Sequence, residues 1–115
     1  MDYCILLTSN LDSRYLNNVN MLKTYFENRG IPYDEIDGAE SKNRKLRDIL
    51  MKVAVDNGGK AEYPSLFIMR SNRNIQFVGN WHRIQMILDN DCISPEDLKK
   101  MPEVYTFGRY FRDIL

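Results

Sequence analysis

The stretch from Glu62 to Ile84 decides the fold of this chain, and it reads EYPSLFIMRSNRNIQFVGNWHRI. One short apolar run is residues 66–69, and Ile75, Phe77 and Val78 form another. Residues 70–74 between them are polar and rich in turn formers. Apolar runs of this length that are separated by a polar turn are typical of a β-hairpin. The stretch therefore predicts two antiparallel strands in the second half of the chain.

The residues that flank the hairpin support this prediction. Pro64 has no N–H to give to a strand ladder, so it belongs at the start of the first strand. Gly79 closes the second strand, Asn80 is a favourable helix cap, and Trp81 begins a helix.

Composition limits the class of protein. The chain has 115 residues, enough for one domain with its own core. Sixteen basic residues balance sixteen acidic ones, so the net charge indicates neither a nucleic acid nor an anionic membrane as partner. No apolar run approaches the roughly 20 residues that a membrane span needs, and residues 3–8 predict a strand rather than a signal peptide. Cys4 and Cys92 are too few and too far apart for a disulfide framework, which suits the cytoplasm and also the nucleus.

Outside the hairpin, apolar periodicity predicts two strands and several helices. The first half begins with a strand at 3–8, buried on both faces, and a helix that Gly30 ends, with the apolar face Tyr15, Val19, Leu22 and Phe26. A strand at 31–36 follows, and then a helix at 41–55 with the apolar face Leu46, Ile49, Leu50 and Val53. After the hairpin come a helix from Trp81, a helix that Ser94 caps and Pro95 begins, and a helix at 103–115 with the apolar face Val104, Phe107, Phe111 and Ile114. An early parallel βαβ unit before a late hairpin predicts an α/β domain over 1–91, with a four-stranded mixed sheet flanked by helices. Residues 92–115 form a helical extension that packs on the same domain.

Three short motifs link this order to a known family. Asn43-Arg44-Lys45 begins the second long helix, Tyr63–Pro64 precedes the third strand, and Gly79-Asn80-Trp81 opens the third helix. With these motifs in this order, residues 3–91 resemble the glutaredoxin branch of the thioredoxin fold, and within it the Src-homology-3-binding glutamate-rich-like proteins. The resemblance implies a thioredoxin-like fold with a cis peptide bond before Pro64. It does not extend to the residues from Cys92 onward.

The loop between the first strand and the first helix bears on catalysis. A dithiol oxidoreductase of this fold has Cys-x-x-Cys there, because the helix N-terminus lowers the pKa of the first cysteine. Residues 8–15 read TSNLDSRY and contain no cysteine. Four of them, Ser9, Asn10, Asp12 and Ser13, are suited to capping the helix, but a serine hydroxyl does not replace a thiolate. The sequence therefore predicts no catalytic residue and no enzyme activity.

The remaining candidates for reactive chemistry have simpler explanations. Cys4 lies in a strand expected to be central, where it is a small buried hydrophobe. Cys92 follows Asp89 and Asp91, whose charges disfavour a thiolate. His82 is the single histidine and is expected on the surface, so neither a metal site nor a metal cofactor is predicted.

The resemblance also implies a groove for a ligand or partner, which binds an extended peptide or glutathione. The residues that correspond to it are Asn10, Asp12, Arg44, Tyr63, Pro64, Gly79, Asn80 and Trp81. Basic residues on the helix at 41–55 form its solvated face or a second docking surface. Aromatic residues near the C-terminus are expected to pack on the core, not to stack on nucleic-acid bases. No Pro-x-x-Pro is present, so an Src-homology-3 partner is not indicated.

These observations lead to one interpretation with two alternatives. The chain is expected to be a cytoplasmic protein-interaction module, adaptor or regulatory, which lacks the redox dithiol and needs no cofactor. The first alternative is a glutathione- or peptide-binding glutaredoxin relative with weak or no thiol oxidoreductase activity. The second is a monothiol oxidoreductase that works through Cys92. The sequence names neither the partner nor the oligomeric state.

Overall fold

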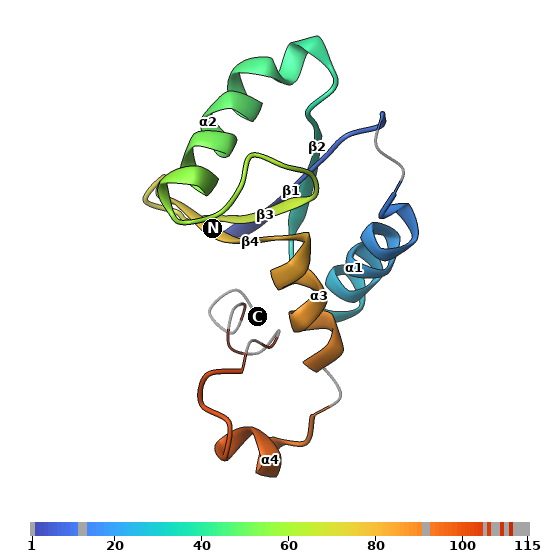
Figure 1. Cartoon of the computed structure of the whole chain (residues 1–115), viewed down its shortest axis with the longest axis vertical. Coiled ribbons are helices and arrows are strands. Elements are labelled where there is room, and N and C mark those ends of the chain that lie inside the picture. Colours follow the sequence, from blue (N-terminus) through green and yellow to red (C-terminus); the bar gives the residue numbers. More distant parts are fainter. Residues whose placement is uncertain are drawn as a thin grey trace.

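The computed structural model of the chain describes residues 2–11, 14–90, 93–104, 106, 109 and 111. Over these residues it is an α/β arrangement, with one mixed sheet between helices (Figure 1). No helix in this part of the chain is long and apolar enough to cross a membrane.

The sheet has four strands in the order β2-β1-β3-β4. Strand β1 (Tyr3–Thr8) pairs in parallel with β2 (Tyr33–Asp37) and antiparallel with β3 (Ser65–Met69). Strand β3 in turn pairs antiparallel with β4 (Ile75–Asn80), and a register shift falls between Leu66 and Phe67. The predicted hairpin and the predicted parallel pair are both confirmed.

Helices cover both faces of this sheet (Figure 1). Helices α1 (Leu16–Arg29) and α3 (Trp81–Asp89) lie on one face, and α2 (Arg44–Asp56) lies on the other. A single 3-10 turn, Ser41–Asn43, leads into α2. The short α4 (Pro95–Lys99) lies beyond α3, far from the sheet (Figure 1).

Two apolar clusters result, one on each face of the sheet. Side chains alternate along a strand, so Leu6 of β1 enters the cluster under α1 and α3, whereas Ile5 and Leu7 enter the cluster under α2. All three are buried, as expected for a strand covered on both faces. The buried members of the first cluster are Cys4, Leu6, Val19, Leu22, Phe26, Ile31, Leu66, Ile68, Val78, Ile84, Ile87 and Phe111, and those of the second are Ile5, Leu7, Leu50, Ala54 and Phe67.

The ends of two helices follow the sequence prediction closely. Gly30 stands just beyond α1 in the left-handed region, with φ of 67°, and Ile31 N–H donates to the carbonyl of Phe26. This is the helix-ending role for which glycine is suited. Ser94 Oγ accepts a hydrogen bond of 3.2 Å from Asp97 N–H, and Pro95 follows it as the first residue of α4.

The predicted apolar face of α2 is wrong at one position. Leu50 is buried, and Leu46 and Val53 are partly buried, but Ile49 is 53% exposed and Ala54 is buried instead. A helix laid on a sheet buries only a narrow stripe. Here the stripe runs through positions 46, 50, 53 and 54, and Ile49 lies at its edge.

The predicted helix at 103–115 does not begin at Glu103. Pro102 and Glu103 form a turn and Val104 is irregular, whereas Arg109 and Phe111 are helical. Thr106 Oγ1 accepts a hydrogen bond of 3.2 Å from Arg109 N–H, the contact that an N-cap residue makes. Predictions for Phe107 and Ile114 lie outside the described residues. The division of the chain into 1–91 and 92–115 stays a prediction.

Candidate functional site

A groove of about 510 Å³ lies where the parallel strands β1 and β2 end. In open α/β sheets, ligands bind in the crevice beyond the carboxyl ends of such strands. The β1–α1 loop, the first turns of α1, the β2–α2 turn and the Tyr63–Pro64 segment enclose it. Its lining residues are Thr8, Ser9, Asn10, Tyr15, Leu16, Val19, Glu35, Ile36, Asp37, Glu40, Lys42, Asn43, Tyr63 and Pro64.

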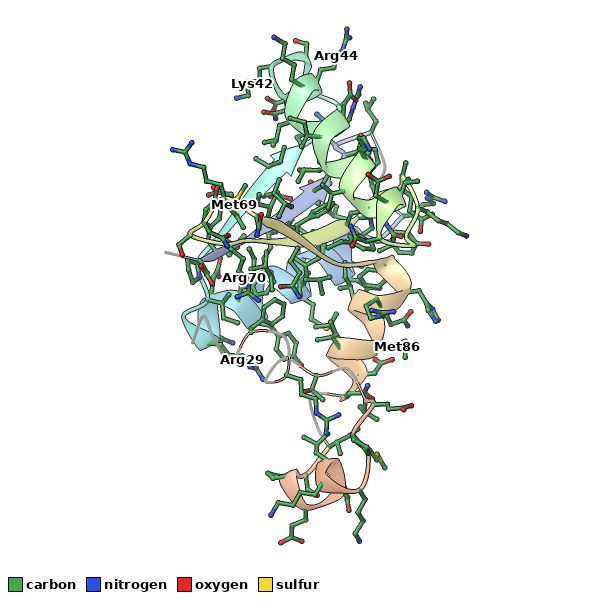
Figure 2. All side chains as sticks on the ribbon, turned by 90° about the vertical axis from the view of Figure 1, so that its left-hand side faces the viewer. Arg29, Lys42, Arg44, Met69, Arg70 and Met86 are labelled. Atoms are coloured by element: carbon green, nitrogen blue, oxygen red, sulfur yellow. The ribbon has the colours of Figure 1, made fainter. Side chains whose placement is uncertain are left out.

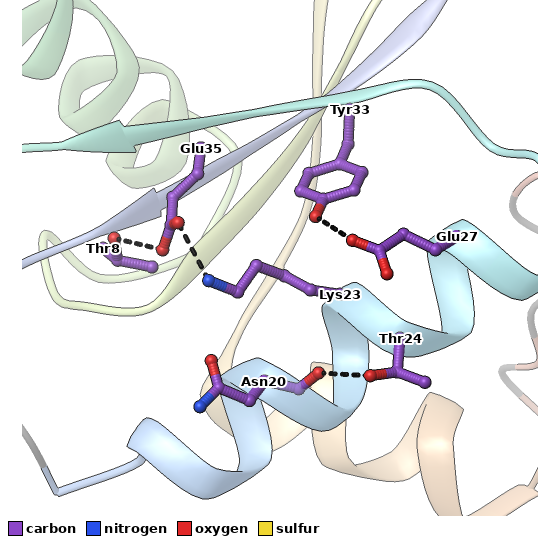
Figure 3. A network of polar contacts seen from close by, with 7 residues as sticks. All are labelled: Thr8, Asn20, Lys23, Thr24, Glu27, Tyr33 and Glu35. Carbon is purple, nitrogen blue, oxygen red and sulfur yellow. Dashed lines mark hydrogen bonds and ion pairs between the residues drawn. The ribbon is translucent and has the colours of Figure 1, made fainter.

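Glu35 anchors one wall of the groove through two side chains (Figure 3). Its Oε2 accepts a hydrogen bond of 3.2 Å from Thr8 Oγ1, and its Oε1 lies 3.0 Å from Lys23 Nζ. These contacts join β1, β2 and α1 at the strand ends. The lysine also balances the charge of this carboxylate.

Asp37 ties together the two loops that border the groove. Its Oδ1 accepts hydrogen bonds from the backbone N–H of Asn10, at 3.2 Å, and of Ala39, at 2.9 Å. Gly38 N–H donates to the carbonyl of Thr8 at 2.8 Å, which continues the strand pairing into the turn. The last residue of β2 therefore sets the position of the β1–α1 loop.

The Tyr63–Pro64 segment lies across from that loop. Its peptide bond is cis, as predicted, and Pro64 is buried while Tyr63 is partly buried. The Tyr63 ring covers Gly38 so closely that a Cβ at position 38 would collide with it. Any side chain at position 38 would therefore have to displace the Tyr63 ring beside the groove.

The structure brings only some of the predicted groove residues together. Asn10, Tyr63 and Pro64 line the groove, and Asp12 lies outside the described residues. Arg44 is exposed on α2 and does not line it. Trp81 contributes indirectly, because its ring stacks on that of Tyr15, a lining residue, with centroids 5.0 Å apart.

Gly79 and Asn80 are at the end of β4 and do not line the groove. Asn80 precedes α3, but its side chain does not cap the helix as predicted. Its Oδ1 accepts from Lys60 N–H at 2.8 Å, and its Nδ2 donates to the Lys60 carbonyl at 2.9 Å and to Ser65 Oγ at 2.8 Å. The side chain is thus used to hold the loop before β3.

The predicted capping of α1 by the β1–α1 loop is also wrong for the residues that the structure describes. Helix α1 begins at Leu16 with Tyr15 at the cap position, which makes no side-chain capping bond. Ser9 Oγ accepts instead from Leu11 N–H, at 3.2 Å, within its own loop. The helix begins too far along the chain for Ser9 and Asn10 to reach its free N–H groups.

Basic residues of α2 mostly face the solvent, as the simpler interpretation predicted. Figure 2 shows Lys42 and Arg44 at the N-terminal end of the helix, at the periphery of the molecule. Lys52 pairs with Asp56 at 2.7 Å along the helix surface. Arg47 differs, since it pairs with Asp48 and donates to the carbonyl of Gly38, at 3.3 Å, so it supports the turn beside the groove.

Sequence reasoning missed the acidic part of the groove. Glu35, Asp37 and Glu40 line it, and none was a candidate. A usable signal was present, because carboxylates at the end of the second strand of a βαβ unit lie beside the end of the first.

The two cysteines and the histidine, which the sequence analysis considered for thiol or metal chemistry, do not line the groove where the structure describes them. Cys4 is fully buried, as expected for a small hydrophobe, and burial raises the pKa of its thiol to about 12. Cys92 lies outside the described residues. His82 is exposed on α3, as predicted. Within the described residues, no three His, Cys, Asp or Glu side chains form a group that could hold a metal ion.

No protein-family model, no curated protein and no solved structure matches this chain. The resemblance to glutaredoxin relatives therefore stays a hypothesis, which rests on the three motifs and on the order of the elements.

Proposed function

We propose that the chain is a thioredoxin-like protein of the glutaredoxin type that acts as a protein-interaction module without redox catalysis. The element order and the strand order are compatible with that fold. So is the position of Tyr63–Pro64, at the start of β3 and beside the β1–α1 loop. In this interpretation the groove holds an extended segment of another protein.

The groove itself is the observation that carries the proposal. Its volume, about 510 Å³, lies within the roughly 300–1,000 Å³ range of ligand-binding pockets. Apolar side chains from α1, β2 and the Tyr63–Pro64 segment line it, together with polar groups from both loops. A site of this kind suits a chain segment that offers both an apolar side chain and polar backbone groups.

Redox catalysis has little support from the residues near this groove. The β1–α1 loop has serine, asparagine and aspartate where a dithiol enzyme has cysteines. Cys4 is buried in the sheet, and its raised pKa keeps it a neutral thiol at physiological pH.

The charge of the groove favours a peptide over glutathione as its occupant. Glutathione carries two carboxylates and one ammonium group, so its net charge is negative. The lining offers three carboxylates and one lysine. Lys23 and Lys42 pair with two of these carboxylates, and the remaining charge of Asp37 disfavours this anionic ligand.

Affinity capture from lysate with a groove-blocked variant tests the proposal. Asn10→Trp places an indole at the groove, on an exposed residue whose backbone contact to Asp37 does not need the side chain. Asn17→Trp, on the exposed side of α1, adds the same group elsewhere. We expect partners that wild type and Asn17→Trp retain and Asn10→Trp loses.

Two results would contradict the proposal. One is a set of captured proteins that Asn10→Trp retains, at an unchanged melting temperature, since binding would then lie outside the groove. The other is turnover of a glutathionylated substrate that either Cys4→Ser or Cys92→Ser abolishes.

A further inference from the structure

Among the residues that the structure describes, two of the three carboxylates that line the groove are paired with a lysine, and the third is not. Glu35 has Lys23 at 3.0 Å, and Glu40 has Lys42 at 3.3 Å. Asp37 has no such lysine: its Oδ1 accepts from two backbone N–H groups, and no described residue donates to its Oδ2. One carboxylate oxygen at the groove is therefore available to a ligand.

The apolar side of the groove also has an uncovered part. Leu16, at the start of α1, lines the groove and is 55% exposed. Val19, one turn further along α1, and Tyr15, at the cap position of that helix, also line the groove and are better covered. An occupant that covers Leu16 would remove apolar surface from water, which favours binding.

From this groove we infer that its occupant is an extended peptide with a lysine or arginine residue, whose cation pairs with Asp37 and whose apolar stem or neighbour covers Leu16. This inference rests on the proposed function. Long basic side chains suit such a site because their methylene groups lie along apolar surface while the charged end reaches a carboxylate. Lys42, the one cation among the described lining residues, is 78% exposed and next to Glu40, so it does not oppose a second cation strongly.

Peptides selected from a random library on phage test this inference. The library is selected on the wild-type protein, and enriched peptides are made with a fluorescent label. Their Kd values are then measured for wild type, Asp37→Asn, Glu40→Gln, Asn10→Trp and Asp34→Asn. Asparagine keeps the Oδ1 acceptor that the two backbone N–H groups need, and Asp34→Asn removes an exposed charge from the same strand, outside the groove.

We expect enriched peptides to contain lysine or arginine beside an apolar residue. Asp37→Asn should raise their Kd about tenfold, as for the loss of a charge-assisted hydrogen bond, and Asp34→Asn should leave it within about twofold. Added salt should weaken binding, because part of the attraction is between exposed charges. Glu40→Gln, at an exposed residue, measures whether a second carboxylate of the groove also favours basic peptides.

Each contrary result separates this inference from the proposed function. Neutral or acidic peptides that Asn10→Trp blocks would overturn the inference and leave the groove as a peptide site. Basic peptides whose Kd is unchanged by Asp37→Asn would do the same, even if Glu40→Gln weakens them. If no selected peptide depends on the groove, the proposed function fails and the inference fails with it.

Discussion

The guanidinium of Arg70 donates a hydrogen bond of 2.9 Å to the carboxylate of Asp2, which links the chain before β1 to the turn of the hairpin. The backbone N–H of Ser71 donates to the same carboxylate at 2.8 Å. Both hydrogen bonds favour the charged form, the one from Arg70 most, and they hold the pKa of Asp2 below its usual range. This contact fixes the start of the central strand against the end of β3.

Asp2→Asn should therefore destabilise the protein at neutral pH and matter less in acid. A carboxylate whose pKa is lowered in the folded state stabilises it above its unfolded pKa of about 3.9, and this contribution is lost as the pH falls through the folded value. Urea midpoints of wild type and variant at pH 7 and pH 3 measure the effect. Asp34→Asn, on the exposed part of β2, is the control. A difference of the same size at both pH values would contradict this account.

Phe111→Ala should cost about 3–5 kcal/mol of unfolding free energy, the range for a large buried aromatic side chain. Phe111 is fully buried, and its ring meets that of Phe26 edge-on with centroids 5.6 Å apart. Truncation after Pro102 removes the same contact and should lower the melting temperature by about ten degrees or more, since about 1 kcal/mol corresponds to roughly 4–8 °C in a domain of this size. Met101→Ala, at a side chain that is 43% exposed, should change it little. If the truncated protein melts like the full-length one, Phe111 does not contribute to the core.

Gly38→Ala should destabilise the protein by about 1–3 kcal/mol, because the added Cβ would overlap the Tyr63 ring. The cause is a clash between two side chains, so Tyr63→Leu should reduce the cost of Gly38→Ala. A double-mutant cycle by urea denaturation measures this coupling. Additive effects of the two substitutions would show that the strain lies in the backbone of the turn.

Sequence reasoning predicted those features whose partners are near in the chain. Gly30 ends α1 and Ser94 caps α4 through contacts within a few residues. Two of the failures involve distant partners. The side chain of Asn80 is hydrogen-bonded to the backbone of Lys60, and Asp37 reaches the β1–α1 loop only because β1 and β2 pair in parallel. A capping residue in the sequence does not reveal a competing partner twenty residues away, and an acidic strand end does not reveal its groove until the strands are paired.

The last prediction concerns the thiol of Cys4, which should be inert in the folded protein. Burial raises its pKa to about 12 from the ordinary value of about 9, so almost no thiolate is present near pH 8. In a Cys92→Ser variant, an aromatic disulfide reagent should react with Cys4 only after urea unfolds the chain. The raised pKa also makes the stability of the fold depend on pH. The contribution of Cys4 to the free energy of unfolding is fully present below about pH 9 and is lost as the pH rises further, because the thiol of the unfolded chain then ionises first. Fast reaction of Cys4 in the folded variant would contradict its burial, and it would reopen the question of thiol chemistry in this protein.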